Sequence, residues 1–297
     1  MSAIATTNNE RPVFFEAADE DLFGIVTEPT MTPNGAGLIL LEPAIPNRNR
    51  FSVRIARRVA ALGYHSLRFD YHGAGESTGA TDKYLLDRPY VDDVLAAVRC
   101  LEENGVDRIA LVGTCFGART ALASAVRIPR LRGVVLLATP IRDFERGNPG
   151  IEATPTSQYV KRALRPGTLA KLRSPRLRQY AVRVARTKVR AAVRSRGGEA
   201  STGPNGVSPR FSEPLAELGA RGTPVLLAYG TGDEFHGPFR EARPTLSDVL
   251  DAPGSRIEER VVPGRIHGLS TLAVQDEVMS LIETWLAELD GVGAHAA

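Results

Sequence analysis

Short apolar runs recur along the chain and alternate with amphipathic stretches. Residues 12–17 and 22–27 are rich in apolar and aromatic side chains and flank an acidic turn, a pattern that predicts an antiparallel hairpin. Four further runs have the length and apolar character of buried strands, at residues 36–41, 108–112, 133–138 and 224–229. Strands are also predicted at residues 66–70 and 256–262, which include charged residues.

Helix signals lie between these runs, where apolar residues return at intervals of three and four. The predicted helices cover residues 50–62, 90–103, 118–126, 214–218, 239–250 and 272–289. Strand and helix in alternation predict an α/β fold with a mostly parallel sheet that is covered by helices on both faces.

The alternation stops after Pro140 and resumes near Ser212. A structureless loop of roughly seventy residues would be unusual inside a compact domain, so this stretch predicts an inserted subdomain. We therefore expect a core made of residues 1–143 and 212–297, with a helical cap over residues 144–211.

The composition is that of a soluble globular protein, with 43% hydrophobic and 24% charged residues among 297. Its two cysteines, Cys100 and Cys115, cannot make a disulfide framework and lack metal-ligand spacing. The first eleven residues are polar, unlike a signal peptide, and no apolar run approaches the ~18 residues that cross a bilayer. These features predict a cytoplasmic protein without a transmembrane segment; they do not indicate an oligomeric state.

The net charge of +3 conceals a strongly basic segment in the predicted cap. Residues 153–198 carry thirteen Lys or Arg and no acid, while the other 24 basic residues face 34 acidic ones. Over residues 176–196 an apolar stripe among arginines predicts an amphipathic basic helix, with Arg178, Arg183 and Arg186 as candidate substrate-binding residues.

Three interpretations of this basic helix stay open. In the first, the helix packs on the acidic core and its charges are solvated. In the second it recognises an anionic partner, and in the third it binds an anionic membrane surface. An anionic partner would be an acyl carrier protein, the phosphates of coenzyme A or an acidic substrate. Nucleic acid is not expected, because aromatic residues do not interleave with the charges.

The candidate chemistry centres on Gly113-Thr114-Cys115-Phe116-Gly117. An apolar strand precedes this Gly-x-Cys-x-Gly motif and a helix-forming stretch follows it, which is the context of a nucleophile elbow. Glycines leave room around the sharp turn, and the start of a helix favours a thiolate. The alternative interpretation is a small buried cysteine that begins a helix.

A cysteine nucleophile needs a base and a group that orients the base. Among five histidines we select His267, which follows the last predicted strand and has glycines on both near sides. Asp233, after the penultimate strand, is the candidate acid for the imidazole Nδ1–H, with its neighbour Glu234 as the alternative. His236 is the competing base.

Acyl chemistry also needs donors for a developing oxyanion. The backbone N–H of Phe116, directly after the nucleophile, is one candidate. The second is expected in the loop after residues 36–41, where prolines at 43 and 46 have no N–H, so we select Ala44 ahead of Ile45.

These motifs resemble the α/β-hydrolase superfamily and, within it, the serine-aminopeptidase-like branch that includes exosortase-associated hydrolases. The residues that carry the resemblance are Asn47-Arg48, 54–62, 67–77, 113–117, Asp233 and His267-Gly268. The chain departs from the family at two places, with Glu42-Pro43 where His-Gly is usual and Cys115 where serine is usual. A cysteine there resembles dienelactone hydrolases and polyhydroxyalkanoate synthases.

The resemblance and the residues together predict a cysteine-dependent hydrolase of a thioester, ester or lactone that needs no metal or redox cofactor. Its substrate would be a small acyl compound, free or bound to a carrier protein or coenzyme A. Three alternatives remain: acyl transfer to an amine, alcohol or thiol; elimination or cyclisation without an acyl-enzyme; and a non-catalytic protein that holds a carrier or ligand.

Overall fold

The chain folds around a mixed sheet in a computed structural model that describes residues 9–42, 49–80, 86–143 and 206–290. The described residues contain eight strands in the order β1-β2-β4-β3-β5-β6-β7-β8. Their bounds are β1 Glu10–Ala17, β2 Glu20–Thr27, β3 Ala36–Leu41, β4 His65–Phe69, β5 Arg108–Thr114, β6 Leu131–Leu137, β7 Val225–Gly230 and β8 Ile257–Val262. The predicted hairpin β1–β2 and the pair β2–β4 are antiparallel, whereas the pairs from β4 to β8 are parallel.

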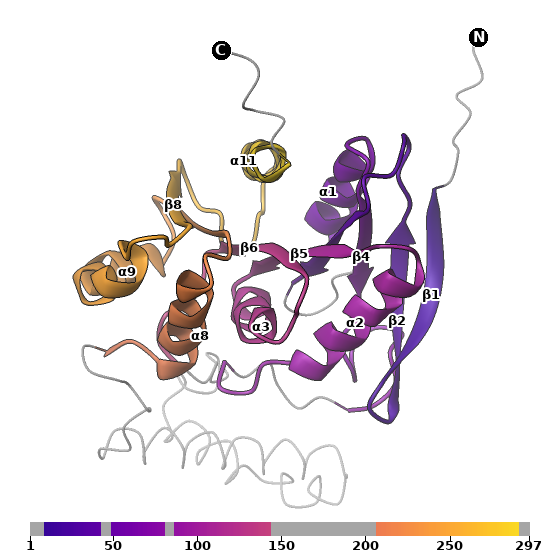
Figure 1. Ribbon diagram of the computed structural model, residues 1–297, viewed down its shortest axis with the longest axis horizontal. Coiled ribbons are helices and arrows are strands. Elements are labelled where there is room, and N and C mark those ends of the chain that lie inside the picture. The colour runs from indigo at the N-terminus through magenta and orange to yellow at the C-terminus, as the bar shows by residue number, and fades with distance from the viewer. Residues whose placement is uncertain (1–8, 43–48, 81–85, 144–205, 291–297) are drawn as a thin grey trace, which may run out of the picture. The chain divides into compact units, whose positions relative to one another are not determined.

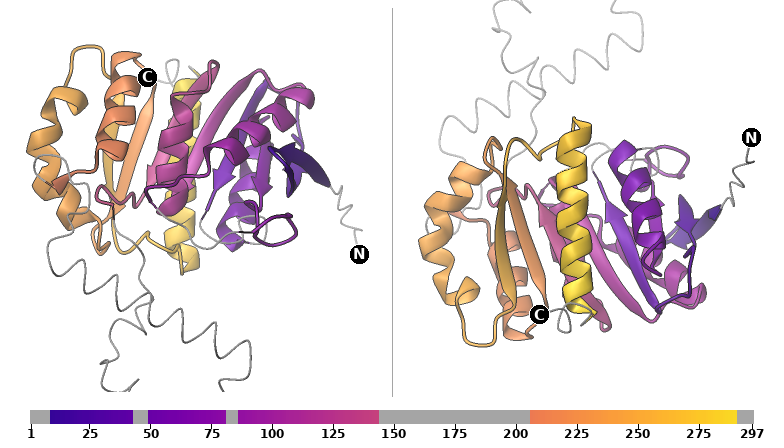
Figure 2. Two further views of the ribbon diagram at one scale, coloured as in Figure 1. Left: turned by 90° about the horizontal axis from the view of Figure 1, so that it is seen from below. Right: turned by 90° about the horizontal axis from the view of Figure 1, so that it is seen from above.

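Helices cover both faces of this sheet, as the alternation predicted (Figure 1). One face carries α1 and α11, and the other carries α2, α3 and α8 (Figures 1 and 2). The helix bounds are α1 Arg50–Ala60, α2 Val91–Glu103, α3 Phe116–Ala125, α8 Pro209–Ala220, α9 His236–Ala242, α10 Ser247–Leu250 and α11 Leu272–Leu289.

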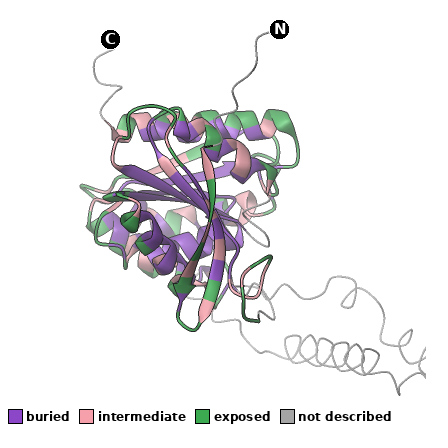
Figure 3. Cartoon of the chain, turned by 90° about the vertical axis from the view of Figure 1, so that its right-hand side faces the viewer, coloured by how far each residue is buried: buried purple, intermediate pink, exposed green. Residues whose placement is uncertain are grey.

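The core lies along the inner strands. Every residue of β3 and β7 is buried, because helices pack on both of their faces. Figure 3 shows the same division, with buried strands at the centre and exposed residues on the outer sides of the helices. A continuous apolar run therefore marks a central strand here.

Two helices differ from the predictions at prolines. The helix expected over residues 239–250 is divided into α9, a 3-10 turn at Arg243–Leu246 and α10. Pro244 causes the division, because proline has no N–H and its ring clashes with the preceding turn. The helix expected over 214–218 begins earlier, at Pro209, where the Ser208 side chain accepts the N–H of Arg210.

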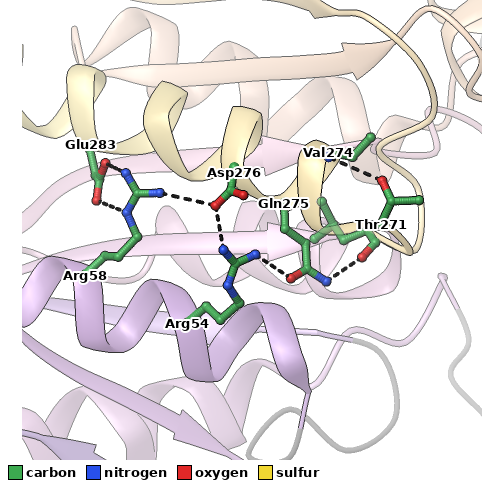
Figure 4. Close-up of polar contacts among 8 residues, drawn as sticks. Arg54, Arg58, Thr271, Val274, Gln275, Asp276 and Glu283 are labelled. Carbon is green, nitrogen blue, oxygen red and sulfur yellow. Dashed lines mark hydrogen bonds and ion pairs between the residues drawn. The ribbon is translucent and has the colours of Figure 1, made fainter.

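Polar contacts hold α11 against α1 (Figure 4). Arg58 pairs with Glu283, and Arg54 Nη1 donates to Gln275 Oε1 over 2.9 Å. The buried Gln275 then donates from Nε2 to the Leu269 carbonyl over 2.7 Å. Helix α1 is thus connected through α11 to the loop that carries the candidate base.

The chain divides by its contacts into two compact units, residues 1–142 with 203–297 and residues 143–202. Within the first unit, the Ser208 N–H donates to the Ile141 carbonyl over 2.8 Å, so both ends of the inserted segment leave the core at one place. Most of the expected cap, 144–211, lies outside the described residues.

Candidate active site

Cys115 occupies the sharp turn between β5 and α3. Its backbone has a φ of 53° and a ψ of −111°, which side-chain-bearing residues rarely adopt. Its N–H donates to the Leu137 carbonyl of β6 over 3.0 Å, and the residue is only 2% exposed. Such backbone strain persists where the surroundings enforce it, and it concentrates at functional sites.

The two motif glycines are required by close backbone contacts. A Cβ on Gly113 would lie 2.4 Å from the Gly117 carbonyl oxygen. A Cβ on Gly117 would lie 1.9 Å from the Leu41 carbonyl oxygen and 3.0 Å from the Glu42 nitrogen. The second contact also places the end of β3 directly beside the elbow.

The expected oxyanion donors are described in part. Phe116 is the first residue of α3, so its backbone lies at the positive end of the helix dipole. Ala44 and Ile45 lie outside the described residues. The end of β3 at Leu41 is nevertheless next to Gly117, which is the arrangement that a donor from the following loop requires.

The imidazole of His267 contacts a different carboxylate from the one expected. His267 Nδ1 lies 2.6 Å from Glu234 Oε1, and the side chain is 11% exposed. Arg265 pairs with the same carboxylate at 3.1 Å. Burial raises the pKa of Glu234, but its own backbone N–H, His267 and Arg265 outweigh burial and lower it.

Asp233 instead organises the backbone around the histidine. One of its carboxylate oxygens accepts the N–H of His267 over 2.8 Å, and the other accepts the N–H of Gly230 over 2.7 Å. We expected Asp233 at Nδ1, and the structure places Glu234 there. The physical reason is that backbone donors already occupy both Asp233 oxygens, while Glu234 approaches the ring with a longer side chain.

Cys115 and the histidine–carboxylate pair lie at the same edge of the sheet. Cys115 follows β5, Glu234 follows β7 and His267 follows β8, and these strands are parallel. The β7 and β8 loops are joined by the Gly232 N–H, which donates to the Gly264 carbonyl over 2.7 Å. Open α/β sheets bind ligands at this edge, beyond the carboxyl ends of the strands.

Glu42 is a site residue that the sequence analysis did not select. Its carboxyl group is buried at the end of β3, where Thr114 Oγ1 donates to Glu42 Oε1 over 3.1 Å. Burial raises the pKa of Glu42 to about 7, although the Thr114 hydroxyl opposes the shift. The sequence feature that could have identified Glu42 is its position directly after a fully apolar strand and before Pro43.

A second histidine–carboxylate pair follows β4. His72 Nδ1 lies 2.9 Å from Asp93 Oδ2, and the His72 ring packs on Tyr90 with centroids 4.4 Å apart. Tyr90 in turn contacts Phe116, with centroids 5.2 Å apart. The competing base His236 begins α9 and stacks on Tyr229.

The remaining expectations concern the cap arginines, metal ligands and membrane-spanning segments. Arg178, Arg183 and Arg186 all lie outside the described residues. Within the described ranges, no group of three or more His, Cys, Asp or Glu could hold a metal ion. None of the helices described is long and apolar enough to cross a membrane.

Comparison with known proteins decides the family. The family described as serine aminopeptidase, S33 matches residues 47–269, which include the elbow, Asp233 and His267. The chain belongs to this family of α/β-hydrolases. Its mostly parallel sheet with helices on both faces is the fold of the superfamily, so the predicted fold class is confirmed.

Solved structures agree with the α/β-hydrolase fold at low sequence identity. The esterase Pf2001 of Pyrococcus furiosus is 17% identical with a TM-score of 0.60, and the match covers 94% of this chain and 90% of that one. The proline iminopeptidase of Mycobacterium smegmatis is 19% identical with a TM-score of 0.54, over 95% and 99%. Est1E of Butyrivibrio proteoclasticus, whose structure has ferulic acid bound, is 14% identical with a TM-score of 0.58, over 94% and 99%.

One curated relative of this hydrolase matches over a shorter stretch. The quorum-quenching protein AidA of Acinetobacter baumannii (strain MDR-ZJ06) is 29% identical over 127 residues. The match spans 41% of this chain and 41% of the relative.

Proposed function

We propose that this hydrolase cleaves a thioester, ester or lactone through a cysteine acyl-enzyme. Cys115 is the nucleophile, His267 the base and Glu234 the group that orients the imidazole. Asp233 holds the backbone of His267, and the Phe116 N–H is one oxyanion donor. The supporting observation is the strained backbone of Cys115, enclosed by two glycines that no larger residue could replace.

The reaction proceeds in two stages. His267 removes the thiol proton as sulfur attacks the carbonyl carbon, and the oxyanion forms beside the start of α3. The tetrahedral intermediate collapses, the imidazolium protonates the departing group, and a thioester remains on Cys115. Water, deprotonated by His267, then attacks this thioester and releases the acid with the free thiol.

Cysteine in place of serine favours particular substrates. Its acyl-enzyme is itself a thioester, so exchange with a thioester substrate is close to energetically neutral. An amine, alcohol or thiol can then compete with water, which makes acyl transfer the nearest rival. Recognition of a carrier protein or coenzyme A by Arg178, Arg183 and Arg186 stays a prediction.

Intact-protein mass spectrometry during turnover tests the proposal. A panel of acyl-thioesters, esters and lactones should leave an acyl mass on Cys115, and quorum-signalling compounds belong in the panel because of the relative's name. Cys115→Ala should remain folded and lose both the adduct and turnover. Full turnover by this variant would exclude the cysteine mechanism.

The remaining alternatives give different results in the same experiment. Acyl transfer gives a new conjugate when an acceptor is added, whereas hydrolysis gives the free acid with or without it. Elimination or cyclisation proceeds without an acyl adduct. A protein that only binds ligand shows no turnover, and its iodoacetamide reaction rises only around the ordinary thiol pKa.

A further inference from the structure

Five arginines converge on a depression at the opposite edge of the sheet from Cys115. Its volume is about 490 Å³. The arginines lie at the beginnings of β5 and β6, directly before β6 and β8, and at the C-terminal end of α8. We call it the arginine pocket, and its basic residues are Arg108, Arg130, Arg132, Arg221 and Arg256.

Carboxylates neutralise this pocket only in part. Arg108 lies 3.4 Å from Asp107, Arg221 pairs with Glu217, and Arg132 pairs with Asp290. Arg130 and Arg256 have no ion pair with any residue that the structure describes. Five guanidinium groups thus face three carboxylates, and the unmatched charge lies at two exposed arginines.

Arg132 lies deepest among these groups. Its side chain is 10% exposed, and its Nε is buried without a hydrogen-bond partner in the described part of the chain. The Asp290 carboxylate that it contacts also accepts the Tyr64 hydroxyl over 2.6 Å. The buried Nε is closed to a ligand, so Arg132 contributes to the pocket through the positive charge of its guanidinium, whose carboxylate partner is shared with Tyr64.

We propose that the arginine pocket binds a small metabolite that carries two or more phosphate groups. Guanidinium groups bind phosphate oxygens through paired hydrogen bonds, and several around one depression can engage adjacent phosphates together. The volume lies in the range of small-molecule sites. Leu131, Pro224 and Leu289 also line it and supply an apolar wall for the organic part of such a ligand.

This site is separate from the candidate active site. Arg108 is the first residue of β5, and Cys115 follows its last residue. A strand of this length separates them by roughly 20 Å. A phosphorylated ligand held in the arginine pocket therefore does not place its reacting group at Cys115, and its binding does not require the thiol.

Calorimetric titration with tripolyphosphate at constant ionic strength tests the proposal. The full-length protein should bind one equivalent, and the Cys115→Ala variant should bind it equally well. Arg130→Ala with Arg256→Ala should weaken binding by about tenfold or more, because two guanidinium contacts are lost. Both side chains are exposed, so their removal should leave the thermal midpoint unchanged.

Arg88→Ala with Arg99→Ala is the matched control, because it removes the same charge from two exposed arginines outside the pocket. This variant should bind tripolyphosphate within about twofold of the wild type. Equal weakening in both double variants would show that tripolyphosphate is attracted only by the net positive charge of the protein, and this would overturn the proposal. Absence of saturable binding, or equal affinity for sulfate, would overturn it too.

Discussion

At the scale of single residues, neighbours in sequence make different contacts in the candidate active site. Asp233 and Glu234 are adjacent, yet Asp233 binds backbone N–H groups while Glu234 contacts the imidazole of His267. A carboxylate on Nδ1 sets the tautomer that leaves Nε2 as the base, whereas a carboxylate on the backbone holds the loop. The two acids should therefore respond differently to neutralisation.

Glu234→Gln should lower kcat by about a hundredfold or more and leave stability nearly unchanged, because it removes the charge that stabilises the imidazolium. Asp233→Asn should mainly lower the thermal midpoint, because two backbone N–H groups lose a charged acceptor. Steady-state kinetics and thermal unfolding of both variants test this. The reverse pattern would return Asp233 to the orienting role that its sequence position suggested.

Glu42 makes the stability of the fold depend on pH. A glutamate in the unfolded chain has a pKa of 4.5, whereas the pKa of Glu42 in the folded protein is about 7, because burial disfavours the charged form. Below the lower value both states hold the proton. Between the two values only the unfolded state releases it, so stability falls as pH rises through this window and is constant above it.

Glu42→Gln should abolish this dependence, because glutamine keeps a neutral side chain beside Thr114 at every pH. The free energy of unfolding of the wild type should fall relative to the variant by about 3 kcal/mol between pH 4.5 and 7. Urea unfolding of both proteins across the range measures the difference. Parallel curves would show that Glu42 is not held in its neutral form.

At the scale of helices and strands, polar side chains hold the loops near the candidate active site and the ends of the insertion. The apolar pattern of the sequence does not predict these contacts. Gln275 of α11 donates to the Leu269 carbonyl, two residues beyond His267, and Arg54 of α1 donates to Gln275. Arg119 of α3 is fully buried and donates to the Pro140 carbonyl over 3.1 Å and to Ser208 Oγ over 3.2 Å. One guanidinium thus joins the end of β6 to the start of α8, the two points where the inserted segment leaves the core.

Arg119→Met should therefore lower the free energy of unfolding by about 3 kcal/mol, because charged hydrogen bonds are lost and their acceptors stay buried. Arg99→Met, an exposed position on α2, is the control and should change stability by less than about 0.5 kcal/mol. Chemical denaturation compares the two. Similar small effects in both variants would mean that Arg119 does not hold the ends of the insertion.

At the scale of the molecule, the two proposed sites lie at opposite ends of the parallel strands. The elbow and the histidine loop follow the carboxyl ends of β5 and β8, while the arginine pocket surrounds the other ends of the parallel strands. Helices on both faces bury the strands between them, so each edge remains a place where side chains can meet a ligand.

Much of this arrangement could be predicted from local patterns. Apolar runs located inner strands such as β3, β5 and β7, since a strand between two helix layers must be apolar on both faces. The edge strands β1 and β8 contain charged residues and are mostly exposed or half-buried. The elbow context followed from two glycines between a strand and a helix. Residues 239–250 show the limit at this level, because their helical spacing predicted one helix where the structure has a 3-10 turn that contains Pro244.

The sequence by itself determined the order of elements, the α/β-hydrolase fold and the three loops that carry Cys115, the paired acids and His267. Only the tertiary structure decided which acid contacts the imidazole, that Glu42 is buried beside Thr114, and that five distant arginines surround one depression. The physical reason is the distance along the chain over which each kind of interaction acts. Strand and helix patterns arise from neighbours along the chain, whereas burial, charge pairing and pKa depend on residues that folding brings together from distant segments.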